Sequence, residues 1–351
     1  MMNFKHIIDK LTPGIGREVA LAQVLRALTA KRIWNATINV ASFLLSWMIR
    51  KPVVWGYPPI VNIEPTNICN LHCPLCVTGC KKMKRPRGYI DMDSFQRFVD
   101  RVADRVIYLT LYHQGEPYLH KQFHDMVAYA KQKGVYVTTS TNAHFISREE
   151  AERVVKSGLD SMIISLDGVE QSTYETYRIG GHFDTVIDGI QNLVEAKKRF
   201  KSRVPYLLLQ FLVMKHNQHE LSKIKELSRE LGVDRLLIKT IEVTTLEEAK
   251  AWLPDDKAYR RYHVSEKNFT VKQGKGACPR LWLNTLVDWD GALVPCCFDK
   301  NADYKMGNVW DHDFETLWRN DVYTAFRKQM LDDRNSIDMC RNCNYGIGLF
   351  K

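Results

Sequence analysis

Three cysteines early in the chain stand at a spacing that suits metal chemistry. Cys69, Cys73 and Cys76 form a C-x3-C-x2-C pattern directly after an apolar run at Pro59–Ile63 that predicts a strand. Three thiols cannot complete a tetrahedral zinc site, nor can they bind all four irons of a cubane cluster. A centre held by these residues keeps one coordination position for an exogenous ligand. A zinc knuckle and reduced thiols in the core are the alternatives.

The remaining composition indicates a globular protein in a reducing compartment. The chain has 351 residues, of which 45% are hydrophobic and 26% are charged, as is usual for one large domain with a smaller one. We expect no secretory signal, because the start of the chain is mixed and polar. The nine cysteines are clustered rather than spread as a disulfide framework. We therefore expect a cytoplasmic protein whose cysteines bind metal.

Positive charge is concentrated in two places. The net charge is +10, and residues 1–57 carry eight Lys or Arg against two acids. The run Lys81–Arg87 adds five positive charges after the cysteine motif. Such asymmetry favours anionic partners such as phosphate esters, acidic head groups or acidic peptides, although a solvated surface has the same composition. No aromatic-interleaved basic stripe accompanies the charge, so we expect no nucleic acid.

Residues 1–57 predict a basic helical extension. Ala20–Lys31 carries apolar residues at helical spacing, and Ile33–Ile49 is largely apolar and ends before Pro52. At about 17 residues, with two asparagines inside, the second helix is short for a membrane span. We expect it either to pack on the outside of the catalytic domain or to lie on a membrane surface, which would make the protein peripheral.

From Ile60 onward, strands and helices alternate. Apolar runs predict six strands, at 60–64, 106–111, 135–139, 160–166, 206–214 and 234–240. Helices are expected near 92–104, 121–133, 147–157, 183–200 and 218–231. Asp93 and Ser147 are the expected N-caps, and Gly134 and Gly232 the expected helix ends. The pattern predicts an α/β fold, a partial (β/α)6 TIM-like barrel whose active site lies at the carboxyl ends of the strands, where the cysteine motif follows the first strand.

The rest of the chain predicts a linker and a small C-terminal auxiliary-cluster domain. Residues 241–277 are strongly charged and are interpreted as a linker. A hairpin is expected from Arg280–Val287 and Ala292–Val294, turned at Asp290-Gly291, with a helix at Phe314–Met330. The expected divisions of the chain are 1–57, 58–240, 241–277 and 278–351.

With these features the chain resembles radical S-adenosylmethionine (radical SAM) enzymes that carry a C-terminal auxiliary-cluster domain of the short SPASM, or twitch, type. The resemblance covers residues 58–240 and 278–343. It implies that Cys69, Cys73 and Cys76 hold a [4Fe-4S] cluster whose fourth iron binds SAM. It also implies reductive cleavage of SAM to methionine and a 5′-deoxyadenosyl radical that abstracts hydrogen from a substrate C–H bond.

The resemblance assigns SAM contacts to successive strand ends. Gln114-Gly115-Glu116 is similar to the family's Gly-Gly-Glu segment, with Gln114 in place of the first glycine. The glycine permits close approach, and Glu116 or the nearby main chain accepts from the methionine ammonium. Ser165 and Arg178 correspond to the residues that grip the SAM carboxylate, for which a guanidinium is well suited.

Three more positions near the motif have weaker assignments. Asn142 ends the third strand, where its amide is expected to reach ribose or substrate. Leu75 stands where relatives carry an aromatic residue before the third cysteine, so adenine stacking would be replaced by apolar contact. Cys80 is expected only to line the loop.

The C-terminal cysteines resemble the family's four-ligand auxiliary site. Cys278, Cys296, Cys340 and Cys343 imply a second [4Fe-4S] cluster, suited to electron transfer because it is fully ligated. A structural zinc site is the alternative. In relatives of the sulfatase-maturating branch the position of Cys297 carries an Asp that suits deprotonation of the substrate during oxidation, whereas a thiol there could donate a hydrogen atom to a substrate radical. A small buried side chain is the simpler interpretation of Cys297.

The expected activity is that of a radical SAM oxidoreductase or epimerase acting on a sugar-like or phosphorylated small molecule. The short extension resembles that of enzymes acting on sugar and aminocyclitol carbons. Peptide modification is the alternative, weakened because residues 1–57 predict helices rather than a strand-rich leader-peptide domain. A lipid substrate would rest on the amphipathic N-terminus alone. The expected electron donor is a reductase such as flavodoxin or ferredoxin, and the non-enzyme alternative is a zinc-stabilised scaffold.

Overall fold

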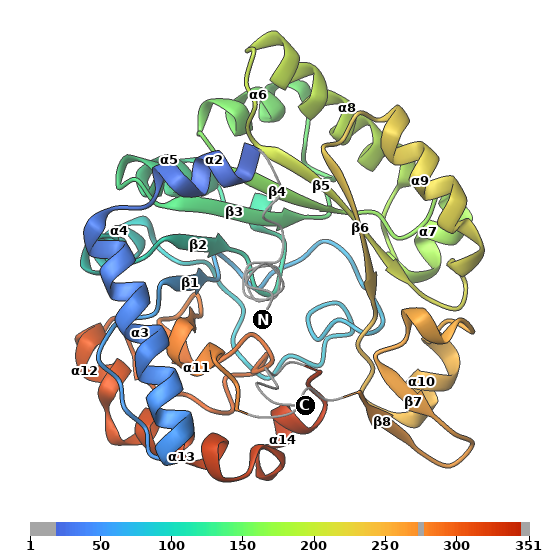
Figure 1. Ribbon diagram of the computed structural model, residues 1–351. Coiled ribbons are helices and arrows are strands. Elements are labelled where there is room, and N and C mark those ends of the chain that lie inside the picture. Colours follow the sequence, from blue (N-terminus) through green and yellow to red (C-terminus); the bar gives the residue numbers. More distant parts are fainter. Residues whose placement is uncertain (1–18, 273–276, 345–351) are drawn as a thin grey trace.

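One curved sheet organises the fold. A computed structural model describes residues 19–272 and 277–344. The main sheet has nine strands in the order β11-β10-β9-β1-β2-β3-β4-β5-β6 (Figure 1). Six of them follow the chain and run parallel, namely β1 (Ile60–Ile63), β2 (Tyr108–Leu111), β3 (Tyr136–Thr141), β4 (Ser161–Ser165), β5 (Tyr206–Val213) and β6 (Arg235–Thr240). The predicted partial barrel is confirmed.

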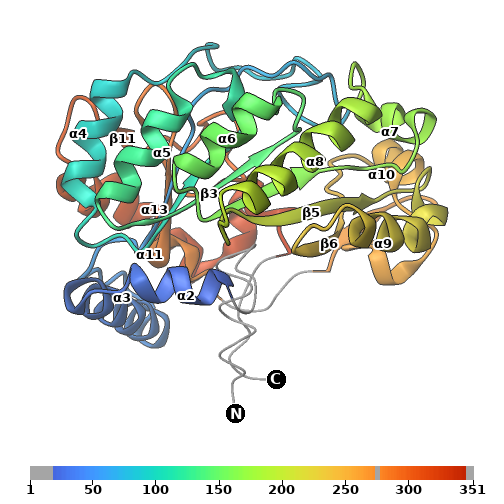
Figure 2. The ribbon, with the colours of Figure 1, turned by 90° about the horizontal axis from the view of Figure 1, so that it is seen from above.

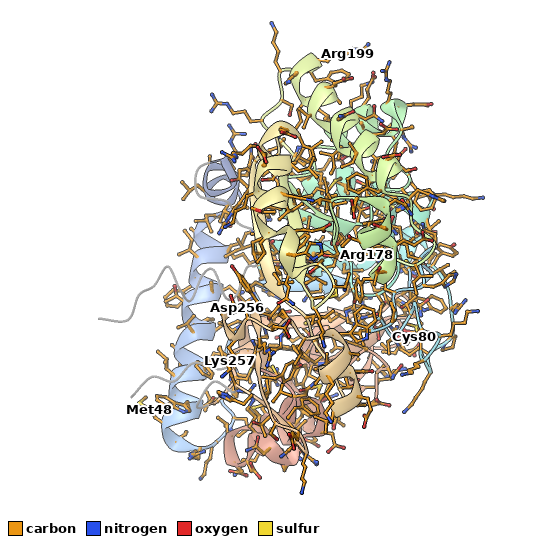
Figure 3. All side chains as sticks on the ribbon, turned by 90° about the vertical axis from the view of Figure 1, so that its right-hand side faces the viewer. Met48, Cys80, Arg178, Arg199, Asp256 and Lys257 are labelled. Atoms are coloured by element: carbon orange, nitrogen blue, oxygen red, sulfur yellow. The ribbon has the colours of Figure 1, made fainter. Side chains whose placement is uncertain are left out.

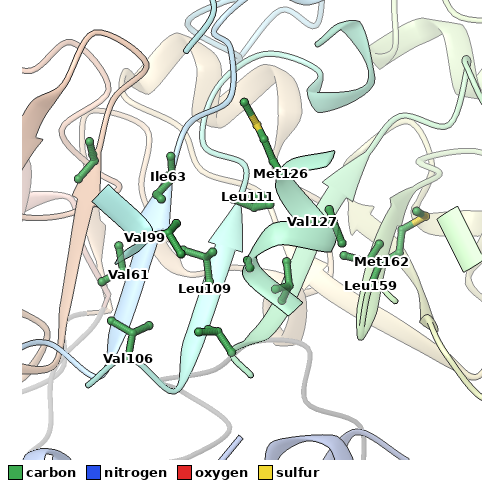
Figure 4. Close-up of a cluster of buried hydrophobic side chains, with 14 of the residues drawn as sticks. Val61, Ile63, Val99, Val106, Leu109, Leu111, Met126, Val127, Leu159 and Met162 are labelled. Carbon is green, nitrogen blue, oxygen red and sulfur yellow. The ribbon is translucent and has the colours of Figure 1, made fainter. Parts of the chain in front are cut away.

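Helices cover the outer face of this sheet (Figures 1 and 2). The five expected ones are α4 (Met92–Val102), α5 (Phe123–Gln132), α6 (Arg148–Lys156), α8 (Phe183–Arg199) and α9 (Leu221–Glu230). A short helix that was not predicted, α7 (Gln171–Tyr177), precedes α8. Val61 and Leu109 from the strands form one buried cluster with Val99 of α4 and Val127 of α5 (Figure 4). This burial is what fixes the helices on the sheet.

Local signals set the ends of these helices. Ser147 caps α6, as expected, by accepting a backbone N–H at 3.1 Å. The N-cap of α4 is Asp91, which accepts a backbone N–H at 2.8 Å, and not Asp93, which lies in the first turn. Gly134 and Gly232 follow helices at φ +69°, the left-handed conformation that glycine adopts without steric cost.

The C-terminal extension continues the sheet on the other side of β1. It contributes β9 (Asn284–Val287), β10 (Ala292–Val294) and β11 (Gly307–Asn308). β9 runs parallel to β1 and antiparallel to β10. The first strand of the predicted hairpin therefore starts later than expected, because Arg280–Leu283 form a helical turn, α11.

The predicted helix at 314–330 is two helices. α12 (Phe314–Arg319) and α13 (Asp321–Asp332) are separated at Asn320, whose side chain accepts a backbone N–H of α13 at 2.8 Å. A polar side chain that caps a new helix favours a break at that position. A further short helix, α14 (Asp338–Arg341), carries one of the C-terminal cysteines.

The segment 241–277 has more regular structure than its sequence predicted. Its described part contains α10 (Leu246–Trp252), which starts with a capping box, and an antiparallel pair, β7 (Tyr262–Val264) and β8 (Phe269–Val271). Charged residues dominate its sequence, so the short apolar patterns within it were not apparent.

Two N-terminal helices lie across the end of the barrel at which β1, β2 and β3 begin (Figures 1 and 2). α2 (Val19–Arg26) ends earlier than predicted, and α3 (Ala30–Ile49) starts after Thr29, whose hydroxyl accepts a backbone N–H of the helix. α3 packs against the C-terminal extension as well as the core. In the part of the chain that the structure describes, no helix is long and apolar enough to cross a membrane. Residues 1–18 of the predicted extension lie outside the described residues.

Candidate active site

Cys69, Cys73 and Cys76 lie in the loop that leaves β1 at its carboxyl end. None of the nine cysteines, all of which lie in the described part of the chain, forms a disulfide. Burial raises the pKa of Cys69 to about 12 and also raises the pKa of Cys73. Thiolates at these positions therefore need a cationic partner, which iron ions provide. The donor set fits an iron–sulfur cluster with three protein ligands.

Side chains from other strand ends surround these sulfurs. Each sulfur lies within hydrogen-bonding range of one predicted cofactor-binding residue: Cys69 of Asn142 Nδ2 (3.9 Å), Cys73 of Arg178 Nη1 (3.8 Å) and Cys76 of Gln114 Oε1 (3.8 Å). The structure thus brings together residues that are far apart in sequence. A ligand bound at an open coordination position beside these thiols would meet the carboxamides of Asn142 and Gln114 and the guanidinium of Arg178.

Gly115 allows the β2 loop to approach the cysteine loop. Its φ is +75°, and a Cβ at this position would lie 2.5 Å from the carbonyl oxygen of Thr66. The next amide, of Glu116, donates to the carbonyl of Ile68 at 2.8 Å. Glycine was predicted here for a close approach, and the partner in that approach is the backbone just before Cys69.

The Glu116 carboxylate holds the end of β3. It accepts from Thr141 Oγ1 at 2.8 Å and from the Asn142 amide at 2.8 Å. The Asn142 side chain in turn donates to Asn70 at 2.8 Å. Burial raises the pKa of Glu116 to about 7, against the opposing effect of these hydrogen bonds. The Glu116 carboxylate therefore positions Asn142.

Arg178 follows α7 and is oriented by Asp167. Its Nε donates to the Asp167 carboxylate at 2.7 Å, and the other oxygen of that carboxylate accepts the Leu212 amide at 2.7 Å. Asp167 is fully buried and is not among the predicted site residues. Its position two residues after Ser165, at the end of a buried strand, was the available signal. Ser165 is the last residue of β4 and is buried.

Leu75 and Cys80 occupy the rest of this loop. Leu75 is half-buried and packs against an apolar cluster that includes Tyr177 and Met214. Cys80 is half-buried, and its sulfur lies 4.0 Å from the carbonyl of Val77. Cys80 contacts its own loop, as the sequence predicted.

The four C-terminal cysteines line one small cavity. Cys278, Cys296, Cys340 and Cys343 surround it together with apolar side chains and two arginines, Arg280 and Arg334. Burial raises the pKa of Cys278, and Cys340 shows the same effect, to about 12. Four thiols around one space, three of them buried and Cys296 half-buried, form a closed donor set, which fits a fully ligated cluster and leaves no protein ligand to be added.

A second cavity, which we call the lumen cavity, lies inside the barrel. Its volume is about 250 Å³. Its walls come from β1, β2, β9 and the adjoining loops: Ile60, Asn62, Tyr108, Thr110, Tyr112, His113, Gln114, Arg280, Asn284, Leu286 and Cys297. Cys297 faces it beside Arg280, whose Nη1 lies 3.2 Å from the sulfur. Gln114 and Arg280 each border this cavity and one of the two cysteine sites, so the lumen cavity lies between them.

The basic run after the cysteine motif is only partly a surface feature. Arg85 is buried, and its two terminal nitrogens lie 2.8 Å from the two oxygens of Glu64, with Asp288 at 3.2 Å. Arg85 thus joins the ends of β1 and β9 and is not available to an anionic partner. The exposed members of the run are Lys81, Lys82, Lys84 and Arg87.

An open cleft of about 1000 Å³ lies between the β7–β8 region and the C-terminal extension. Two contacts join the segment after β6 to the C-terminal extension at this cleft, from Lys300 to Glu242 at 3.0 Å and from the Asn342 side-chain amide to the Val243 carbonyl at 2.7 Å. Its lining carries both signs of charge, including Lys84.

Family comparison agrees with this geometry. Residues 63–238 match the radical SAM superfamily, and residues 278–344 match SPASM, an iron–sulfur cluster-binding domain. The chain belongs to the radical SAM superfamily and carries a SPASM domain. Its cofactors are SAM and two [4Fe-4S] clusters, as predicted.

Relatives of this chain differ in what they act on. It is 24% identical over 300 residues to the tungsten-containing aldehyde ferredoxin oxidoreductase cofactor-modifying protein of Pyrococcus furiosus, covering 76% of this chain and 82% of that protein. It is 23% identical over 333 residues to the Fe-coproporphyrin III synthase of Methanosarcina barkeri, covering 82% and 81%.

Solved structures share the fold. Streptococcus suis SuiB bound to precursor peptide SuiA superposes with a TM-score of 0.60 at 16% identity, covering 89% of this chain and 74% of that one. BtrN in complex with AdoMet and 2-DOIA superposes with a TM-score of 0.52 at 17% identity, covering 84% and 95%.

Proposed function

We propose that the protein is a radical SAM oxidoreductase or epimerase that acts on a C–H bond of a small, polar, hydroxyl-rich molecule held in the lumen cavity. One observation carries this proposal. The cavity borders Gln114 on the side of the cysteine loop and Arg280 on the side of the four C-terminal cysteines. Its size, about 250 Å³, suits a small molecule, and its amide, hydroxyl and phenol groups suit hydrogen bonds to one.

Cys69, Cys73 and Cys76 are the proposed ligands of the SAM-binding cluster, and Cys278, Cys296, Cys340 and Cys343 those of the auxiliary cluster. When bound, SAM and the first cluster supply a hydrogen-abstracting radical. Arg178, aimed by Asp167, is suited to the SAM carboxylate. Gln114, Ser165 and Asn142 supply neighbouring polar groups. The Glu116 carboxylate accepts hydrogen bonds from Thr141 and Asn142 at the end of β3. The methionine ammonium would then bind to main-chain carbonyls near Glu116.

Cys297 is the proposed hydrogen donor if the reaction is an epimerisation. In that step the S–H bond breaks, a C–H bond forms on the substrate carbon, and the resulting sulfur radical requires one electron and one proton from the reductant. Arg280, at 3.2 Å, keeps the sulfur at the cavity wall. In D2O the wild type would place deuterium on the product carbon, and Cys297→Ala would not. Unchanged deuterium incorporation in Cys297→Ala would remove this role.

The electron donor is proposed to be an acidic protein such as flavodoxin or ferredoxin. Lys81, Lys82, Lys84 and Arg87 are exposed directly after the cysteine loop. Opposite charge would steer an acidic protein to this side of the chain, and the encounter would weaken with salt.

Peptide modification is the second candidate. The open cleft of about 1000 Å³ beside β8 favours it, since an extended chain needs more room than the lumen cavity offers. The shared fold with SuiB supports the same reading, although fold alone does not fix a substrate.

Deuterium transfer distinguishes the two candidates. Deuterated aminocyclitols and sugar phosphates, or deuterated peptides, are incubated with the reduced holoenzyme, and deuterium in 5′-deoxyadenosine is measured. Thr110→Val removes a hydroxyl from the lumen cavity with little change in volume and should raise KM about tenfold for a small molecule. Thr270→Trp, at an exposed position of the cleft, should leave that KM unchanged. Transfer only from peptides, blocked by Thr270→Trp, would reject the small-molecule proposal.

A further inference from the structure

Helix α3 is amphipathic in the reverse of the usual sense. Its buried residues are mostly polar: Arg32, Asn35, Asn39, Ser42, Phe43 and Ser46. Most of its large apolar residues point outward. A surface helix normally buries its apolar stripe and exposes its polar one, so this arrangement needs a cause on each side.

On the inner side, hydrogen bonds fix the orientation of α3. The Arg32 guanidinium donates to four backbone carbonyls, including those of Ala103 (2.7 Å) and Lys133 (2.7 Å). The Asn39 side chain donates to the carbonyls of Tyr57 (2.5 Å) and Trp282 (2.6 Å). Rotating the helix to bury its apolar face would leave these buried carbonyls without donors, at a cost of about 1–3 kcal/mol each.

On the outer side, the apolar residues form one stripe. Trp34 is 67% exposed and Met48 is 68% exposed, with Val40 and Leu44 between them at helical spacing. Trp55, 52% exposed, follows the helix. Val40 and Leu44 are also exposed among the described residues, at 42% and 37%, and a patch of this kind marks an interaction site.

Positive charge accompanies the stripe. Arg26 and Lys51 are exposed near the two ends of α3, and Lys31 pairs with the nearby Asp104. Because a second copy of the chain would bring the same cations, self-association through this face is electrostatically unfavourable. Tryptophans exposed on and just after a helix that is not long and apolar enough to span a membrane, with basic residues near its ends, suit the interface of a bilayer.

We propose that the outward face of α3 docks on a membrane surface that contains anionic phospholipid. Docking leaves the cysteine loop free, because Met48 lies on the opposite side of the molecule from Cys80 (Figure 3). An electron donor can then reach the exposed basic run while the enzyme is bound. This inference is independent of the substrate proposed above.

Co-sedimentation of the full-length holoenzyme with lipid vesicles tests the proposal. Phosphatidylcholine vesicles are used with and without phosphatidylglycerol. Trp34→Ser/Leu44→Ser/Met48→Ser removes the stripe, and Arg26→Glu/Lys51→Glu reverses the charge. Val322→Ser/Phe200→Ser is the matched control, since these side chains are 55% and 38% exposed elsewhere on the surface. SAM cleavage is measured for every variant and reports folding and function separately from lipid binding.

The wild type and the control should bind vesicles that contain phosphatidylglycerol. The stripe variant should lose at least about tenfold in partitioning, and the charge variant should weaken similarly at low salt. The proposal is overturned if the wild type fails to bind, or binds phosphatidylcholine alone equally well. It is also overturned if the stripe variant binds normally, or if its only change is from dimer to monomer.

Discussion

Asp167 accepts the Nε–H of Arg178 at 2.7 Å, and this pair aims a guanidinium at the cysteine loop. Nη2 of the same guanidinium also pairs with Asp167, at 2.6 Å, and Nη1 lies 3.8 Å from Cys73 Sγ. Burial by itself lowers the pKa of Arg178, but the negative charge of Asp167 outweighs this effect and raises the pKa well above its usual value. The ion pair is therefore a way to hold one fixed positive charge at a site where an anionic cofactor group is expected.

Asp167→Asn should weaken SAM binding without unfolding the chain. Asparagine keeps the shape and one acceptor oxygen but loses the charge that orients Arg178, so we expect about tenfold weaker SAM binding. Isothermal titration of the reconstituted protein with SAM measures this change. Asp332→Asn, which breaks an exposed pair with Lys328, is the control. Equal SAM affinity in Asp167→Asn and the control would contradict the positioning role.

Substitutions in the two sets of cysteines should each remove one cluster, but only those in the first set should abolish SAM cleavage. The reconstituted wild type should bind on the order of eight irons per chain. Cys73→Ala should lose about half of the iron and all SAM cleavage, whereas Cys340→Ala should lose about half of the iron and keep reductive SAM cleavage. Cys80→Ala is the matched control within the same loop and should keep both. Iron analysis and 5′-deoxyadenosine quantification provide the measurements, and iron loss in Cys80→Ala would require a different ligand set.

Gly115→Ala should cost more stability than a conformationally similar glycine elsewhere. Gly158 also has a positive φ, +77°, but its added Cβ would meet nothing closer than 3.6 Å, against 2.5 Å at Gly115. Gly158→Ala should therefore show only the left-handed penalty, about 1–2 kcal/mol. Gly115→Ala should show that penalty plus a clash with the Thr66 carbonyl. Denaturant unfolding compares the two, and similar losses would mean that the cysteine loop moves away freely.

Glu116→Gln should flatten part of the pH dependence of stability in the cofactor-free chain. Burial raises the pKa of Glu116 from 4.5 to about 7. Between these values the folded chain keeps a proton that the unfolded chain releases, so the free energy of unfolding falls as pH rises, by about 3 kcal/mol in all. Glutamine does not titrate. Urea unfolding of wild type and variant is measured at several pH values across this window, and the difference between their free energies of unfolding isolates the contribution of Glu116. A difference that does not vary with pH would contradict the raised pKa.

The barrel was predictable because its signals are local. Apolar runs such as Ile60–Ile63 and the capping serine Ser147 are visible in a short window of sequence, and alternation of strand and helix leaves few topologies. The family resemblance then predicted which residues after the strands would meet at the cysteine loop. Asn142 and Arg178 do approach the cysteine sulfurs.

What was not predictable depends on partners far away in sequence. Arg85 looked like part of a solvated basic run, but Glu64 and Asp288 bury it. Asp167 looked like a loop residue until its contact with Arg178 was known. The pattern of α3 showed that the helix is amphipathic, but not which face is inside. That choice is made by backbone carbonyls of other elements, which no local pattern contains.

The pairing of β9 with β1 has a consequence for synthesis of the chain. Asn62 on β1 bonds to Asn284 on β9 at 2.5 Å, across a separation of 222 residues. Until the ribosome has made residue 284, β1 is an edge strand with one side of its backbone unpaired, and such edges recruit other chains. One edge of β1 therefore stays open to pairing with other chains until translation is nearly finished. Slow emergence of the C-terminal part would prolong that exposure.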